Sequence, residues 1–243
     1  MIPSPEPFPP PTPPRPQPFW GYPDLFFFIG LCIPCLLIAV LLVRAAKIFA
    51  PMPTSIQLLA VQSVWYFLAF GSVAALFRLR YDRPFWQSLG WLPISFSTAA
   101  GAILAGPLLM ISIGLLGAAL RPPEIELPFE EMLGSPVTTI LLGTLVVILG
   151  PVAEELAFRG FLMPLLMRSA GAVSGIVITG FIFGSAHGYE YRWSWQYMLL
   201  ISLVGCVFGW ARYKTRSTVT SALMHSTFNL AQFVALLWRT RAL

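Results

Sequence analysis

Long runs of apolar residues, many close to 20 residues in length, fill most of the sequence after residue 24. A helix needs about 20 such residues to cross the hydrocarbon core of a bilayer. Only 10% of the 243 residues are charged, whereas a soluble domain carries charge on about 25%, so this chain cannot cover a water-facing surface. The sequence therefore predicts an all-α, polytopic transmembrane helical bundle.

Seven of these runs can be drawn as membrane spans. They cover residues 25–43, 56–77, 98–120, 137–167, 172–187, 195–210 and 219–238. The fourth is the longest and contains Pro151, which lacks a backbone N–H and is expected to kink or split the helix. We therefore expect about seven to eight helices.

Composition divides the chain into three parts. Residues 1–23 form a proline-rich tail that is expected to be disordered and to sample extended conformers in water. Residues 24–136 hold the N-terminal transmembrane helices and an acidic segment at 122–135, for which a solvated loop is favoured over a short interfacial helix. Residues 137–243 form a transmembrane core that carries the remaining intramembrane polar groups.

The charged and cysteine residues exclude some classes of function. The formal net charge is +5, but the basic residues lie in short clusters at the ends of apolar runs. This pattern indicates loops anchored at a lipid surface and no nucleic-acid partner, and it is too even to fix the orientation. Cys32, Cys35 and Cys206 lie inside apolar runs and are expected to be packing residues without redox or metal chemistry.

A pair of adjacent carboxylates begins the first polar cluster inside the predicted membrane core. Glu154 and Glu155 follow Pro151, so they would lie in a first helical turn, facing the positive end of the helix dipole. Glu155 and Arg159 are spaced i, i+4 and can pair along one face, which leaves Glu154 free on another. The alternative to a functional role is that these three residues form a charge-balanced packing motif.

The two histidines of the chain both lie in late apolar runs. If the chain reverses at residues 169–171, Glu155 and His187 lie about 22 and 25 Å from the turn, and so at similar depth. His225 and Asn229 are spaced i, i+4 and share a helix face. Two glycine pairs four residues apart, Gly180 with Gly184 and Gly205 with Gly209, predict close helix packing.

Two carboxylates, two imidazoles and an amide in a low-dielectric bundle are suited to hydrolysing an amide. A glutamate or imidazole takes a proton from water while donors hold the oxyanion. Two histidines and a carboxylate also form a familiar Zn²⁺ set with an open position for water. The soluble zinc-protease motif His-Glu-x-x-His is absent, and the residue types leave both mechanisms open.

Three motifs on separate apolar runs resemble the CPBP family of intramembrane peptidases, which includes the CAAX prenyl proteases and proteins of bacteriocin processing and immunity. The family pattern is Glu-Glu-x-x-x-Arg, Phe-x-x-x-His and His-x-x-x-Asn. The residues that match it, in order, are Glu154, Glu155 and Arg159, then Phe183 and His187, then His225 and Asn229. The resemblance covers residues 137–238.

The resemblance implies a near-eight-helix bundle with a site inside the membrane and the activity of an endopeptidase. By carry-over, Glu154 with His187 activates the attacking water, and His225 with Asn229 stabilises the oxyanion. The implied partners are membrane lipid and a peptide or prenylated protein substrate, and the expected location is a bacterial inner membrane.

The remaining two motif residues, Glu155 and Arg159, are implied to hold the site together. Zinc is the only cofactor implied, and Glu154, His187 and His225 would bind it if a metal is used. Two other classes of protein are considered. One is a non-catalytic membrane scaffold or bacteriocin self-immunity protein, because family membership does not guarantee turnover. The other is a small transporter, which the lack of an apparent inverted repeat disfavours.

Overall fold

The computed structural model describes residues 18–125 and 130–240 and is entirely helical over these ranges, which confirms the predicted fold class. The helices are α1 (Tyr22–Phe49), α2 (Thr54–Tyr81), α3 (Phe85–Ser88), α4 (Phe96–Leu120), α5 (Pro136–Thr144), α6 (Gly150–Glu155), α7 (Met163–Ala170), α8 (Ala172–Ala186), α9 (Trp195–Thr215) and α10 (Thr218–Thr240). Two π-helical segments, Leu145–Leu149 and Leu156–Leu162, join α5, α6 and α7 into one continuous helix, Pro136–Ala170.

Each of the seven predicted spans falls on a helix, but not every helix has the length and composition of a membrane span. By length and composition, four helices could cross a membrane: α1, α2, α4 and the continuous helix Pro136–Ala170. The apolar helix α8 has 15 residues, fewer than the roughly 20 that a crossing needs. It ends at Ala186, so His187 caps its C-terminus instead of lying within it.

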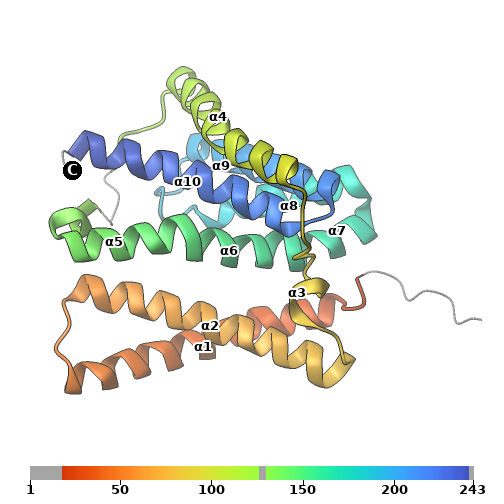
Figure 1. Cartoon of the computed structure of the whole chain (residues 1–243), viewed down its shortest axis with the longest axis horizontal. Coiled ribbons are helices and arrows are strands. Elements are labelled where there is room, and N and C mark those ends of the chain that lie inside the picture. Colours follow the sequence, from red (N-terminus) through yellow and green to blue (C-terminus); the bar gives the residue numbers. More distant parts are fainter. Residues whose placement is uncertain (1–17, 126–129, 241–243) are drawn as a thin grey trace, which may run out of the picture.

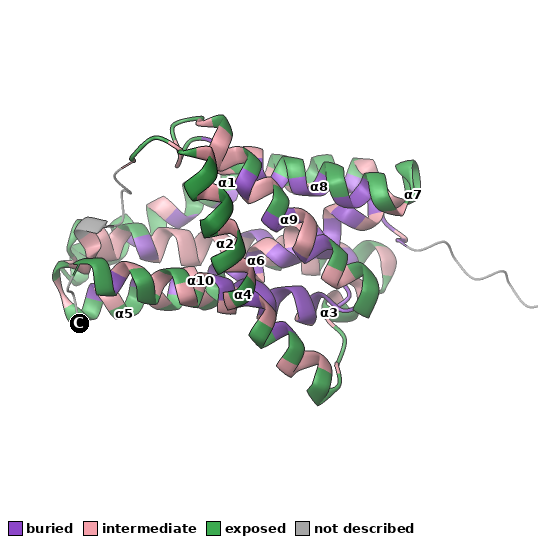
Figure 2. Ribbon diagram, turned by 90° about the horizontal axis from the view of Figure 1, so that it is seen from above, coloured by how far each residue is buried: buried purple, intermediate pink, exposed green. Residues whose placement is uncertain are grey.

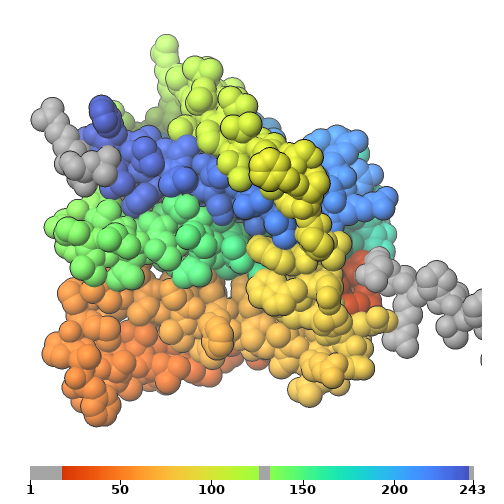
Figure 3. All heavy atoms as spheres, in the orientation of Figure 1, coloured from red at the N-terminus to blue at the C-terminus, as the bar shows by residue number. Residues whose placement is uncertain are grey.

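The helices form two layers. Helices α1 and α2 pack as an antiparallel pair, and the second layer holds the continuous helix together with α4, α8, α9 and α10 (Figure 1). Within the second layer, α8 packs on α9 and α4 on α10. The space-filling view shows the α1–α2 pair lying against the continuous helix (Figure 3).

Glycines set the distance between α8 and α9, as the sequence predicts. A Cβ added at Gly180 would lie 2.9 Å from the backbone nitrogen of Cys206, and one at Gly184 would lie 2.5 Å from the carbonyl oxygen of Met198. A Cβ at Gly205 would lie 3.0 Å from the Cα of Gly180. Lipid tails compete with apolar side chains, so close backbone packing is a main attraction between helices in a membrane.

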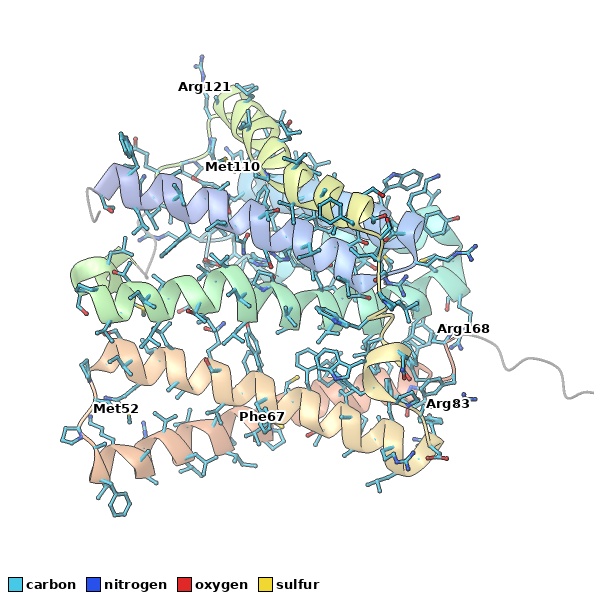
Figure 4. The ribbon with its side chains drawn as sticks, viewed as in Figure 1. Met52, Phe67, Arg83, Met110, Arg121 and Arg168 are labelled. Atoms are coloured by element: carbon cyan, nitrogen blue, oxygen red, sulfur yellow. The ribbon has the colours of Figure 1, made fainter. Side chains whose placement is uncertain are left out.

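The exposed surface is apolar. Figure 2 shows buried residues on the facing sides of the helices and exposed residues on their outer sides. Large apolar side chains point outward, among them Phe67, which is 79% exposed and labelled in Figure 4. Phe77 and Phe208, by contrast, are fully buried between helices. Together with the long apolar helices, this surface makes the chain an integral, multi-pass membrane protein.

The N-terminal segment differs from the prediction of a disordered tail over residues 1–23. Residues 1–17 lie outside the described ranges, but Trp20 is buried and α1 already begins at Tyr22. The indole of Trp20 stacks on Phe161, with ring centroids 5.5 Å apart, and its Nε1 donates to the Phe161 carbonyl. Proline content alone predicted a disordered tail, but Phe19 and Trp20 at the end of the proline run are aromatic and pack in the apolar interior.

The acidic segment is not a loop throughout. Residues Glu130–Gly134 form a short 3₁₀-helix, Glu124 is exposed in extended chain, and Glu126 lies outside the described residues. The three cysteines are free thiols; Cys35 is buried and the other two are half-buried. The packing role expected for them stays a prediction.

Candidate active site

The site begins with an irregularity in the continuous helix. Gly150 donates to the carbonyl of Leu145 in the i−5 register of a π-helix, and the next residue, Pro151, has no N–H with which to continue that register. Pro151 therefore neither splits the helix nor leaves it regular. Instead it starts the six-residue segment α6, which presents Glu154 and Glu155 to the interior of the second layer.

Asn229 occupies the position that Pro151 leaves open. Its Nδ2 donates to the carbonyl oxygen of Val146 at 2.8 Å, and Val146 is the residue five before Pro151. The amide thus satisfies a carbonyl whose π-helical donor is missing, and it ties α10 to the continuous helix. One of the two amide hydrogens of Asn229 is used in this way, and the other is left for a second acceptor.

Glu155 and Arg159 form the ion pair that their spacing predicts. Arg159 Nη1 lies 2.7 Å from Glu155 Oε1, and both side chains are fully buried. The second nitrogen, Nη2, donates to the carbonyl of Gly205 in α9 at 2.7 Å. A buried charge persists only when it is paired and hydrogen-bonded, and these contacts meet much of that need. Among the described residues, Glu155 Oε2 and Arg159 Nε still have no hydrogen-bond partner.

Glu155 also holds one of the histidines. Its Oε1 lies 3.0 Å from His225 Nδ1, which fixes the hydrogen on that nitrogen if the carboxylate is ionised. His187 Nδ1 likewise lies 2.8 Å from the carbonyl of Phe183, a pure acceptor, so this nitrogen is the donor as well. In the neutral form, both imidazoles therefore keep the lone pair on Nε2.

Both Nε2 atoms face Glu154. The distances to Glu154 Oε2 are 4.0 Å from His187 and 3.8 Å from His225. These are too long for direct hydrogen bonds and leave room for an atom between the groups. About a quarter of the side-chain surface of Glu154 and of His187 is exposed, while His225 is almost fully buried.

Aromatic rings close the space around the charged groups. Phe183 lies between Arg159, whose Cζ is 4.5 Å from its ring centroid, and His187, whose ring is 4.8 Å away. Phe208 stacks on His225 at 4.6 Å between ring centroids. These contacts exclude water from one side of each imidazole and strengthen the electrostatic interactions within the cluster.

Comparison with known proteins identifies the part of the chain that holds this cluster. Residues 136–231 match the family model described as Rce1-like, type II CAAX prenyl endopeptidase. This segment is an Rce1-like domain. The comparisons with curated proteins and with solved structures gave no match.

The match begins with the continuous helix and ends within α10, so the Rce1-like domain contains every residue of the three motifs. Helices α1, α2 and α4 lie before it. Helix α2 packs on the continuous helix and α4 packs on α9 and α10, and none of the three contributes a motif residue.

The loop between α8 and α9 adds an acidic residue beside the Rce1-like site. Burial raises the pKa of Glu190 above its ordinary value, with nearby His187 opposing the shift and Glu154 adding to it. The pKa of the adjacent Tyr191 is also raised, first by burial and then by Glu190. Glu190 was not predicted as a site residue, because nothing in its spacing separates it from a solvated loop residue.

The predicted metal ligands do not yet form a metal site. Glu154, His187 and His225 are near one another, but 3.8 and 4.0 Å between their ligand atoms exceeds the about 3.3 Å expected between ligands of a tetrahedral zinc ion. Within the described residues, no three His, Cys, Asp or Glu side chains are grouped closely enough to hold a metal. The three side chains, as they are placed, therefore do not fit a tetrahedral metal ion.

Helix α9 makes two contacts with the candidate site that the sequence did not predict. Gly205 was predicted only as a packing residue, yet its carbonyl accepts from Arg159, and Phe208 was not singled out at all. A glycine pair in the sequence signals close packing but not a backbone acceptor. A phenylalanine in an apolar run carries no signal, because it is the ordinary residue there.

Proposed function

We propose that this chain is an intramembrane endopeptidase that hydrolyses a peptide bond with a water activated by Glu154 and His187. The observation that supports it best is the pair of Nε2 lone pairs facing one carboxylate across gaps near 4 Å. A water between these groups could donate to the glutamate and the imidazole, which is how a general base prepares a nucleophile. The match to the prenyl endopeptidase family supports the same reaction.

In the proposed reaction, Glu154 takes a proton from the water while the water oxygen forms a bond to the peptide carbonyl carbon. The resulting oxyanion accepts from the free amide hydrogen of Asn229 and from His225 when that ring is protonated at both nitrogens. The C–N bond then breaks, and Glu154 returns the proton to the leaving nitrogen. Glu155 and Arg159 take no part in these transfers and keep His225 and α9 in position.

We propose a prenylated protein ending in a CAAX sequence as the substrate class, in a bacterial inner membrane. The support is the family match together with a lipid-facing protein surface, which a prenyl chain can approach from the bilayer. The non-catalytic scaffold is the competing proposal. A scaffold does not account for the partial exposure of the Glu154 and His187 side chains, because a purely structural polar cluster is most stable when it is fully buried.

The test is cleavage by the purified full-length protein, with a prenylated peptide and the same peptide without the prenyl group. Glu154→Gln keeps the side-chain shape and removes its basicity, so turnover should fall to near background while the protein elutes as a single folded species. Asn229→Ala should lower kcat by about 100- to 1000-fold, the usual cost of one oxyanion donor. Equal turnover by Glu154→Gln and the unaltered protein would refute the general-base assignment.

Chelation separates the metal-free reaction from a zinc-dependent one. We expect a strong chelator to leave the rate unchanged. Loss of activity that is restored by zinc would show that Glu154, His187 and His225 rearrange around a metal, and would replace the proposed mechanism while keeping the peptidase. Cleavage of the unmodified peptide as fast as the prenylated one would contradict the proposed substrate class.

A further inference from the structure

A cavity of about 440 Å³ opens at the end of the bundle between α7 and the last turn of α9. Its size falls within the range of small-ligand sites. Three arginines, Arg168, Arg212 and Arg216, line it beside the apolar side chains of Met163 and Trp20. It is separate from the peptidase site, because Arg168 lies about 20 Å beyond Glu154 along the same continuous helix.

The arginines give the cavity an uncompensated positive charge. Among the described residues, no acidic side chain lines it and none of the three arginines forms an ion pair. Arg212 Nε donates to the Thr218 hydroxyl, and Arg168 Nη1 donates to the carbonyl of Pro18. A guanidinium has five N–H donors, and each of these neutral contacts uses one of them.

Aromatic residues place the cavity at a membrane surface. Tyr213 lines it and contacts Trp210, with ring centroids 5.9 Å apart, and the Lys214 ammonium lies 4.6 Å from the Trp210 ring. Tryptophan and tyrosine gather at the level of the lipid headgroups. Figure 4 shows Arg168 at one end of the bundle and Met52 at the other, as expected if the helices run between two such surfaces.

We propose that this cavity binds the headgroup phosphate of an anionic phospholipid. Planar guanidinium groups bind phosphate oxygens in pairs, and basic pockets between transmembrane helices are suited to anionic headgroups. A free phosphate would satisfy the same donors. The lipid is the better occupant because the cavity is also lined by apolar side chains and adjoins exposed apolar residues such as Trp210, along which acyl chains can lie.

The experiment uses full-length protein that has been purified in detergent and depleted of lipid. It is mixed with micelles containing phosphatidylglycerol or phosphatidylcholine, and retained lipid is counted by native mass spectrometry. We expect phosphatidylglycerol to be retained in preference to phosphatidylcholine. The double variant Arg168→Gln/Arg216→Gln should weaken phosphatidylglycerol binding at least about tenfold.

Lys214→Gln is the control for surface charge, because it removes one positive charge from the last turn of α9 at a residue that does not line the cavity. It should change retention by less than about twofold. Equal binding by the double variant and the unaltered protein would overturn the proposal, and so would equal losses in Lys214→Gln, which would indicate a general surface attraction. All variants are first required to elute as one species.

A third arm replaces the lipid with millimolar inorganic phosphate and follows thermal unfolding. Little stabilisation is expected, because the apolar part of the cavity gains nothing from a free ion. Stabilisation by phosphate that the double variant lacks, without retention of phosphatidylglycerol, would overturn the lipid assignment in favour of a soluble anion. Arg212→Lys, which keeps the charge and loses the planar fork, should reduce lipid retention if the guanidinium geometry matters.

Discussion

At the scale of residues, the site is a chain of charges that satisfy one another away from water. Arg159 pairs with Glu155, Glu155 holds His225, and His225 faces Glu154. Each link is short and mostly buried except the last, where the distance increases to 3.8 Å. The one gap in the chain therefore coincides with the group that is proposed to act on water.

Removing Arg159 should unfold the domain more than it alters the chemistry. Arg159→Met leaves Glu155 buried without its cation, at a cost of about 3 to 5 kcal/mol. The double variant Glu155→Gln/Arg159→Met also removes the orphaned charge and should recover much of that loss. Thermal unfolding of both variants in detergent is the measurement. An unchanged midpoint for Arg159→Met, or no recovery in the double variant, would contradict the structural role of the pair.

Glu190 should make stability depend on pH. Because its pKa is raised in the folded state, the folded protein holds a proton in a range where the unfolded chain has lost it. This contribution is complete below the unfolded-state pKa of about 4.3 and is lost as pH rises through the folded-state value. Glu190→Gln should therefore raise the midpoint of thermal unfolding more at about pH 8, where it removes a buried charge, than at about pH 4, where Glu190 is already protonated.

The control for Glu190 is Glu124→Gln, at an exposed position in the segment after α4. Its effect on the unfolding midpoint should be small and similar at both pH values. If Glu124→Gln and Glu190→Gln shift the midpoint equally, burial of Glu190 is not the cause.

At the scale of elements, the continuous helix Pro136–Ala170 organises the molecule. Its two π-helical segments bracket α6, and each offers a carbonyl to a side chain from elsewhere: Val146 to Asn229, and Phe161 to Trp20. Irregular helical turns of this kind are frequent at functional sites. Here they flank the turn that carries Glu154 and Glu155, and their carbonyl groups attach α10 and the N-terminal segment to the same helix.

Helix contact through glycine gives a prediction for α4. A Cβ at Gly106 would lie 2.5 Å from the Met224 carbonyl oxygen and 2.7 Å from the Phe228 nitrogen, whereas one at Gly101 meets nothing within 4 Å. Gly106→Ala should therefore separate α4 from α10 and destabilise by about 1 to 3 kcal/mol. Gly101→Ala on the same helix should be neutral or slightly stabilising. Thermal unfolding that ranks the two variants in the opposite order would refute the close packing of α4 on α10.

At the scale of the whole molecule, the N-terminal segment fastens one layer to the other. Trp20 lies in one buried cluster with Phe77 of α2 and with Phe161 and Leu165 of the continuous helix. Asp24, at the start of α1, accepts hydrogen bonds from the Tyr81 hydroxyl and from Arg80 at the end of α2. The residues around the start of α1 thus hold the α1–α2 pair against the continuous helix of the second layer.

Loss of Trp20 should weaken this attachment. Trp20→Ala removes a fully buried ring and should destabilise by about 3 to 5 kcal/mol, while Trp20→Phe keeps most of the ring contact and loses one hydrogen bond, at about 1 kcal/mol. Trp238→Ala, at a position 79% exposed, should have little effect. Unfolding midpoints in detergent measure all three. Equal midpoints for Trp20→Ala and Trp238→Ala would show that the segment is not an anchor.

The sequence alone predicted that most of the chain faces lipid and that the fold is an all-α membrane bundle, and it named the residues of the candidate site. Apolar runs of membrane length fix helices because a lipid leaves backbone groups no partner outside their own helix. The ionisable groups inside those runs were few enough to be named, and the spacing of Glu155 and Arg159 fixed their pairing because i, i+4 geometry is local.

Only the tertiary structure decided how these residues meet. Three contacts depend on segments far apart in the sequence. Asn229 donates to the carbonyl that Pro151 leaves without a donor, Arg159 donates to the carbonyl of Gly205, and Trp20 is buried against Phe161. The cavity lined by Arg168 and Arg212 likewise exists only where helix ends come together. Periodicity describes one helix at a time, whereas these contacts depend on the register and distance between helices, which packing sets.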